Sequence, residues 1–125
     1  MEDCGRVINP LLVDEQIRGG VVQGIGGALF EHCMYDDDAN LLNGTLADYL
    51  VPMAAEMPDI HVGHVETPME GTELGAKGAG EAGTVGAPAA ILCAVNDALR
   101  PHGALVTEMP ITPDVVLSAL ETARR

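Results

Sequence analysis

Apolar residues recur at helical spacing in three parts of the chain. After Asn9-Pro10 they lie four positions apart and would share one helix face: Ile17, Val21, Ile25 and Leu29. Asparagine followed by proline is typical of a helix start, because asparagine caps free N–H groups and proline fits the first turn. The pattern therefore predicts a helix from residue 10 to residue 29.

Two more helices are predicted in the second half. Residues 88–99 would carry one apolar side: Ile91, Leu92, Val95, Ala98 and Leu99. Thr112-Pro113-Asp114 begins the other helix, with an acid where the helix dipole favours it. Its inner stripe would be Val116, Ala119, Leu120 and Ala123.

Extended segments are predicted between the first two helices, at 41–42, 45–51 and 60–66. The expected fold class is α+β, with helices packed on a small mixed sheet, and residues 1–125 form a single, partial domain. Residues 67–83 have no hydrophobic period, and a loop of this length in a compact domain is usually functional.

Glycine is unusually frequent, at 15 of 125 residues, and gathers in 19–27 and 71–86. Five glycines interrupt the first predicted helix and would weaken it by about 1 kcal/mol each. Either they let another helix pack closely, or the helix is broken near Gly19-Gly20 and offers backbone N–H groups to a ligand.

The net charge of −13 argues against several partners. Such a surface repels nucleic acid and anionic membranes. No run approaches the roughly 18 apolar residues of a membrane span, and the acidic N-terminus is unlike a secretory signal. Three scattered cysteines indicate a reducing compartment, so we expect a cytoplasmic protein.

Two sequence patterns resemble functional sites, but the residues around them disfavour both. Residues 78–83 satisfy G-x-G-x-x-G, but no strand precedes them, which disfavours a dinucleotide site. His61 and His64 would point to opposite faces of a strand, so we expect solvated histidines and no metal ligands.

The glycine-rich end of the loop 67–83, residues 75–83, is called the glycine loop below. Glu81 is its lone carboxylate and lies four positions after Lys77. Free N–H groups of such a loop can hold an anion, and a carboxylate beside it can act as a base. A solvated surface glutamate is the alternative.

The order of three motifs resembles a known family. They are Asp3–Pro10 (DCGRVINP), Gln16–Leu29 (QIRGGVVQGIGGAL) and Gly75–Gly83 (GAKGAGEAG), and the last has the form G-x-K-G-x-G-E-x-G. The chain resembles the C-terminal part of the molybdopterin-binding large subunit of the xanthine dehydrogenase, aldehyde oxidase and carbon monoxide dehydrogenase family. Within the family it looks most like the bacterial carbon monoxide dehydrogenase large subunit.

The resemblance implies a role for each motif residue. Glu81 would be the catalytic base beside molybdenum in an oxidoreductase. Gln23, Gly24, Gly26, Lys77, Gly78 and Gly80 would bind the molybdenum cofactor, a molybdopterin in its cytosine dinucleotide form. The substrate would be a small molecule, and partner subunits would carry iron–sulfur clusters and FAD.

The family's subunit is several times longer than this chain. The resemblance therefore implies a split subunit, a truncated product or a misplaced start, inactive without the remaining part of the molybdenum subunit. The alternative is a non-catalytic remnant or interaction protein that keeps the fold without the cofactor.

Overall fold

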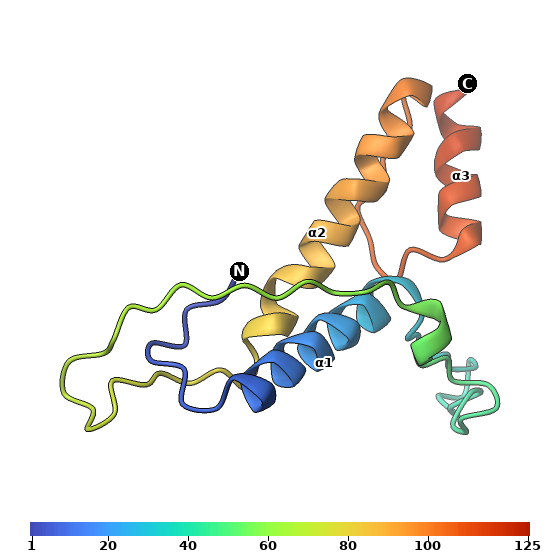
Figure 1. Cartoon of the computed structure of the whole chain (residues 1–125). Coiled ribbons are helices and arrows are strands. Elements are labelled where there is room, and N and C mark those ends of the chain that lie inside the picture. Colours follow the sequence, from blue (N-terminus) through green and yellow to red (C-terminus); the bar gives the residue numbers. More distant parts are fainter.

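Three α-helices dominate the computed structural model, which describes all residues 1–125. They are α1 (Pro10–Leu29), α2 (Ala82–Leu99) and α3 (Pro113–Ala123). Two 3₁₀ turns, η1 (Ala54–Glu56) and η2 (Arg100–His102), complete the regular structure. α1 lies across the lower end of α2, and α3 stands beside the upper end of α2 (Figure 1).

The helix starts follow the sequence at two of three places. The Asn9 side chain accepts a hydrogen bond from the Leu12 N–H, and α3 begins at Pro113 after Thr112. α2, however, begins six residues before the predicted start, with Pro88 inside it. A proline removes one helical hydrogen bond, and here the packing of this part of α2 on α1 outweighs that loss.

Glycines let α1 and α2 approach closely. A Cβ added at Gly24 would lie 2.6 Å from the Ala87 Cβ, and one at Gly20 would lie 3.1 Å from the Gly83 Cα. α1 is continuous through Gly19 and Gly20, so the broken-helix alternative is wrong. The close-packing alternative is confirmed.

A second packing unit joins the far end of α2 to α3. Its buried residues are Leu99, Ala104, Val106 and Ile111, and the apolar side of α3 packs on them. Asn96 on α2 holds the extended segment between the helices, because its amide both donates to the Val106 carbonyl and accepts from the Val106 N–H, each at 2.8 Å. The predicted inner residues of α3 are part of this unit except Ala123, which is exposed.

The predicted mixed sheet is not present. The segments 41–42, 45–51 and 60–66 form no strand, and backbone pairing is limited to isolated bridges: Glu2 with His64, Gly5 with Ala76, and Tyr35 with Leu41. An alternating apolar pattern favours a strand only when a neighbouring strand continues the hydrogen-bond ladder. Here segments 41–42 and 60–66 each pair with a neighbour at one residue only, and segment 45–51 pairs at none.

Little of the chain is buried. Only 14 of 125 residues are buried, and large apolar side chains such as Leu46 and Val85 are about four-fifths exposed. The accessible surface is 8743 Å², whereas a compact monomer of this mass has about 6,300 Å². Much apolar surface therefore lacks a covering partner.

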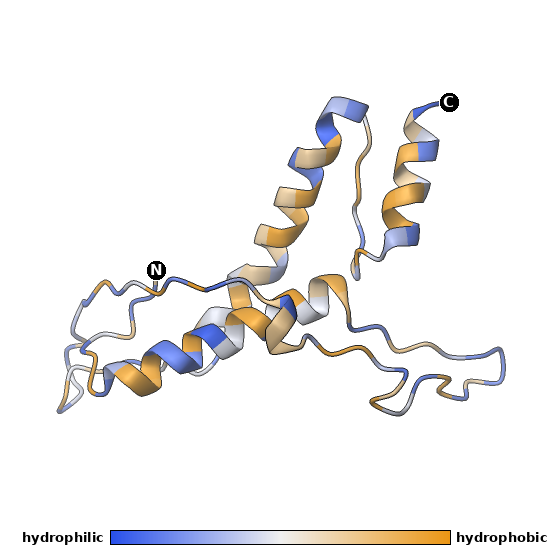
Figure 2. Cartoon of the chain, turned by 45° about the vertical axis from the view of Figure 1, so that its right-hand side comes forward, coloured by the Kyte–Doolittle hydropathy of each residue, from blue (hydrophilic) through white to orange (hydrophobic).

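α2 is the most apolar of the three helices, and little of it is buried. Apolar residues cover much of it in Figure 2. By length and composition, the stretch Ala82–His102 meets the criterion for a membrane span, with a mean hydropathy of 1.3. This is weak support for a span, and the expectation that the chain has none stays a prediction.

Candidate active site

Glu81 lies where the glycine loop enters α2. It is the N-cap residue of α2, and its carboxylate caps no backbone N–H group. The side chain is exposed. Both carboxylate oxygens are therefore available to a ligand or a proton.

One end of the loop is fixed at Lys77. The Lys77 N–H donates to the Cys4 carbonyl at 2.7 Å, and its ammonium lies 3.1 Å from an Asp3 carboxylate oxygen. Asp3 also accepts hydrogen bonds from the N–H groups of Thr67 and Gly5. These donors, Thr67 first, hold the pKa of Asp3 well below its usual range. This end of the loop is thus held by a charged and hydrogen-bonded anchor.

α1 fixes the other end. The Gln16 amide donates to the Gly80 carbonyl at 2.8 Å. The Thr84 hydroxyl lies 3.1 Å from both the Gly20 carbonyl and the Gln23 Oε1. Gln23 is thereby brought to Thr84 in the first turn of α2.

Between these anchors the backbone donors are free. None of the N–H groups of residues 78–83 donates to another group of the chain. A Cβ at Gly78 or Gly80 would meet no atom within 4 Å. Consecutive free N–H groups at a helix N-terminus form an anion-binding surface.

The other two candidate glycines have a different surrounding. Gly24 is buried against α2, and a Cβ at Gly26 would meet Glu31 and Pro52. These two glycines serve the packing of α1 in this structure. Whether they also bind a cofactor stays a prediction.

Three residues of this arrangement had no assigned role in the sequence: Asp3, Gln16 and Thr84. Gln16, Gly20 and Gln23 share one helix face, at spacings of four and three. This spacing could have indicated from the sequence that Gln16 faces the same neighbour as Gly20 and Gln23. Asp3 and Thr84 act through contacts more than 60 residues apart in the sequence, which no local pattern indicates.

His61 and His64 have different surroundings in the structure. His61 is exposed near Asp59, as expected for a solvated histidine. His64 differs from that expectation, because its Nε2 lies 2.6 Å from Asp14 and its Nδ1 is buried without a hydrogen-bond partner. No group of three or more His, Cys, Asp or Glu side chains gathers in the chain.

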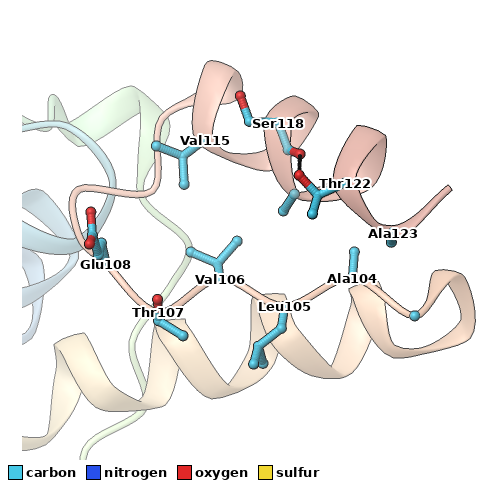
Figure 3. A pocket seen from close by; sticks show the side chains of 11 residues that line it. Ala104, Leu105, Val106, Thr107, Glu108, Val115, Ser118, Thr122 and Ala123 are labelled. Atoms are coloured by element: carbon cyan, nitrogen blue, oxygen red, sulfur yellow. Dashed lines mark hydrogen bonds between the residues drawn. The ribbon is translucent and has the colours of Figure 1, made fainter. Parts of the chain in front are cut away.

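A large open groove lies away from Glu81. It has a volume of about 530 Å³ and runs between α3 and the extended segment 103–108 (Figure 3). Its lining is mostly apolar with three hydroxyl side chains, those of Thr107, Ser118 and Thr122, and the Thr122 hydroxyl donates to the Ser118 carbonyl. Its one ionisable side chain is that of Glu108, and no histidine, lysine or cysteine lines it. The groove therefore offers mainly apolar packing surface.

Comparisons with known proteins agree with the motifs. Residues 1–58 match the molybdopterin cofactor-binding domain family. The chain is 50% identical over 119 residues to the nicotine 6-hydroxylase large subunit of Paenarthrobacter nicotinovorans, and 36% identical over 121 residues to the carbon monoxide dehydrogenase large chain of Hydrogenophaga pseudoflava. These alignments cover 95% and 97% of the chain. Carbon monoxide dehydrogenase is thus a relative, but the nicotine hydroxylase subunit is nearer in sequence.

A solved structure shows the same arrangement. Quinoline 2-oxidoreductase from Pseudomonas putida 86 superposes over 96% of this chain with a TM-score of 0.92 and 45% identity. The chain spans only about 15% of the length of each of these three proteins. Sequence, motif order and fold agree that the chain belongs to the xanthine dehydrogenase, aldehyde oxidase and carbon monoxide dehydrogenase family, and that it corresponds to a part of the molybdenum-binding large subunit.

Proposed function

We propose that this chain supplies the catalytic base and part of the cofactor cradle of a molybdenum hydroxylase. Glu81 is the base. Gln23, Lys77, Gly78 and Gly80 line the cradle, and Gly24 and Gly26 set the distance between α1 and its surroundings. The remaining part of the molybdenum subunit completes the site.

The observation that carries this proposal is the set of free N–H groups at residues 78–83, directly around Glu81. A phosphorylated pterin is anionic, and free backbone donors at a helix N-terminus are suited to it. Gly78 and Gly80 leave the space that a bulky group needs. The residues present therefore fit the cofactor.

Each side chain has a defined contribution. Gln23 presents its amide beside the first turn of α2, where it can donate to the cofactor. Lys77 is paired with Asp3, so it contributes mainly by holding the loop. When bound, the molybdenum cofactor supplies the redox chemistry and the oxygen that is transferred. Glu81 accepts a proton on one of its carboxylate oxygens, which is the usual task of a general base.

The substrate is a small molecule with an electron-poor carbon. Two of the matched proteins are named for nicotine and quinoline, and both of these compounds are nitrogen heterocycles. We extend this class to the present chain. A panel of nitrogen heterocycles and simple aldehydes, assayed with the assembled enzyme, tests it: turnover restricted to aldehydes contradicts it.

The large apolar surface supports assembly with other polypeptides. The excess of accessible area over a compact monomer is about 2,400 Å², enough for a stable interface. We assign this surface to the rest of the molybdenum subunit, and the iron–sulfur clusters and FAD to partner subunits. The cofactor is the cytosine dinucleotide form and the complex is cytoplasmic. The remnant alternative is disfavoured because Glu81, Lys77 and Gln23 are all retained around an open loop.

The test is Glu81→Gln in the assembled enzyme, meaning this chain with the rest of the molybdenum subunit and its electron-transfer partners. The substitution keeps the size of the side chain and removes the base. General-base catalysis contributes about 10²–10⁴-fold, so kcat should fall by that range while the molybdenum content stays near normal.

Glu73→Gln is the matched control, because it removes the same charge from an exposed position eight residues earlier in the loop. It should leave kcat near that of the wild type. If both variants keep the turnover of the wild type, Glu81 is a solvated carboxylate and the remnant alternative is favoured.

A further inference from the structure

Gln16 donates the one side-chain hydrogen bond from α1 to the glycine residues just before Glu81. Its Nε2 donates to the Gly80 carbonyl at 2.8 Å, across 64 residues of sequence. Gly80 immediately precedes Glu81. The bond therefore holds the peptide unit that leads into the candidate base.

We propose that Gln16 is a positioning residue for Glu81, an inference that rests on the proposed function. Gln16 itself touches no reacting atom in this assignment. It acts by fixing the backbone from which the Glu81 side chain projects.

The planarity of the peptide bond explains how one hydrogen bond can do this. The Gly80 carbonyl and the Glu81 N–H belong to one rigid plane and point in opposite directions. A donor on the carbonyl therefore also fixes the direction of the Glu81 N–H. It restricts the backbone of Glu81 on its N-terminal side.

The C-terminal side of Glu81 is fixed separately. The Glu81 carbonyl accepts from the N–H groups of Thr84, at 3.0 Å, and Val85, at 3.3 Å. The Thr84 hydroxyl in turn lies 3.1 Å from the Gly20 carbonyl of α1. Both peptide planes that flank Glu81 are thus held, one by Gln16 and one by the first turn of α2.

No other hydrogen bond holds residues 78–80 on the N-terminal side of Glu81. Gly78 and Gly80 have open space around them, and the N–H groups of residues 78–81 bond to nothing in the chain. Glycine has wide backbone freedom, so this segment depends on its two ends. The preceding anchor is Lys77, three residues before Gly80.

The test compares two methionine substitutions in the assembled enzyme. Gln16→Met keeps an unbranched side chain of similar length and removes the donor. Glu15→Met is the control, because Glu15 is an exposed neighbour on α1 whose recorded side-chain partner is Arg18, outside the loop. A third variant, Gln16→Glu, keeps the shape of the side chain and removes the donor.

We expect Gln16→Met to lower kcat about tenfold with KM unchanged, because small displacements of a catalytic group are costly. Amide hydrogen exchange of residues 78–82 should become faster in the same variant, which is a readout independent of turnover. Gln16→Glu should lower kcat in the same way, because it also lacks the donor to the Gly80 carbonyl. Glu15→Met should match the wild type in all three measurements.

Unchanged kcat and unchanged exchange in Gln16→Met would overturn the positioning role. If Glu81→Gln is inactive in the same series, the proposed function stands while this inference fails. If Glu81→Gln is fully active, the proposed function and this inference fail together. A rise in KM with constant kcat would indicate a binding role for Gln16 and would also overturn the inference.

Discussion

The contact between α1 and α2 gives the sharpest prediction about stability. A Cβ added at Gly24 would lie 2.6 Å from the Ala87 Cβ, 3.0 Å from the Pro88 Cδ and 3.2 Å from the Thr84 carbonyl oxygen. Carbon atoms in favourable contact are about 3.5–4.0 Å apart. Gly24→Ala would therefore require the helices to separate by about 1 Å. None of the three atoms is the end of a flexible side chain, so the strain has no easy relief.

The expected magnitude follows from two opposing effects. Overpacking of this kind costs about 1–3 kcal/mol. Replacing an interior helical glycine by alanine gains about 1 kcal/mol. Gly19→Ala isolates the second effect, because Gly19 is in the same helix and has open space around its Cβ position. Gly24→Ala should therefore be about 1–3 kcal/mol less stable than Gly19→Ala.

The assay is thermal unfolding followed by far-UV circular dichroism, at one fixed concentration of the chain. For a domain of this size 1 kcal/mol corresponds to about 3–5 °C. The Tm of Gly24→Ala should thus lie at least 3 °C, and up to about 15 °C, below that of Gly19→Ala. If the Tm of Gly24→Ala equals or exceeds that of Gly19→Ala, the glycines do not mediate the close approach of α1 and α2.

Three further predictions concern titration and association. The Tyr49 hydroxyl donates to Glu31 at 2.6 Å, and this bond is the main cause that raises the pKa of Tyr49 to about 12. Its stabilisation is therefore present below pH ~10 and lost as the pH rises through 12; a phenolate absorbance titration should show a late step that Tyr49→Phe removes. The depressed pKa of Asp3 implies that its contribution is present above pH ~4 and lost as the pH falls further. Asp3→Asn should accelerate amide exchange of residues 76–80 at neutral pH, and exchange equal to that of the wild type would remove Asp3 as the anchor. The isolated chain, with its exposed leucines and valines, should self-associate or need a partner. A clean monomer with a cooperative, concentration-independent melt would argue against the assignment of its surface to an interface.

The sequence by itself determined the family and the helices. Three motifs in a fixed order identify the family before any coordinates, because each needs particular residues at particular spacings. The helices 10–29 and 113–123 follow from local signals, namely caps, prolines and the 3.6-residue period. Such signals act within one turn or a few turns of chain, so they can be read from neighbouring letters. Glu81 is distinguished in the same way, as the single carboxylate within the glycine signature.

The tertiary structure decided whatever depends on contacts between distant segments. The true start of α2 depends on α1, because packing compensates the hydrogen bond that Pro88 lacks. The expected sheet fails because strand pairing requires a neighbour, and two of the three expected segments pair at a single residue while segment 45–51 pairs at none. The double anchoring of the loop by Asp3 and Gln16 joins residues that are 74 and 64 positions apart. Local pattern cannot specify such pairs, since only the folded backbone brings those donors and acceptors within hydrogen-bonding distance.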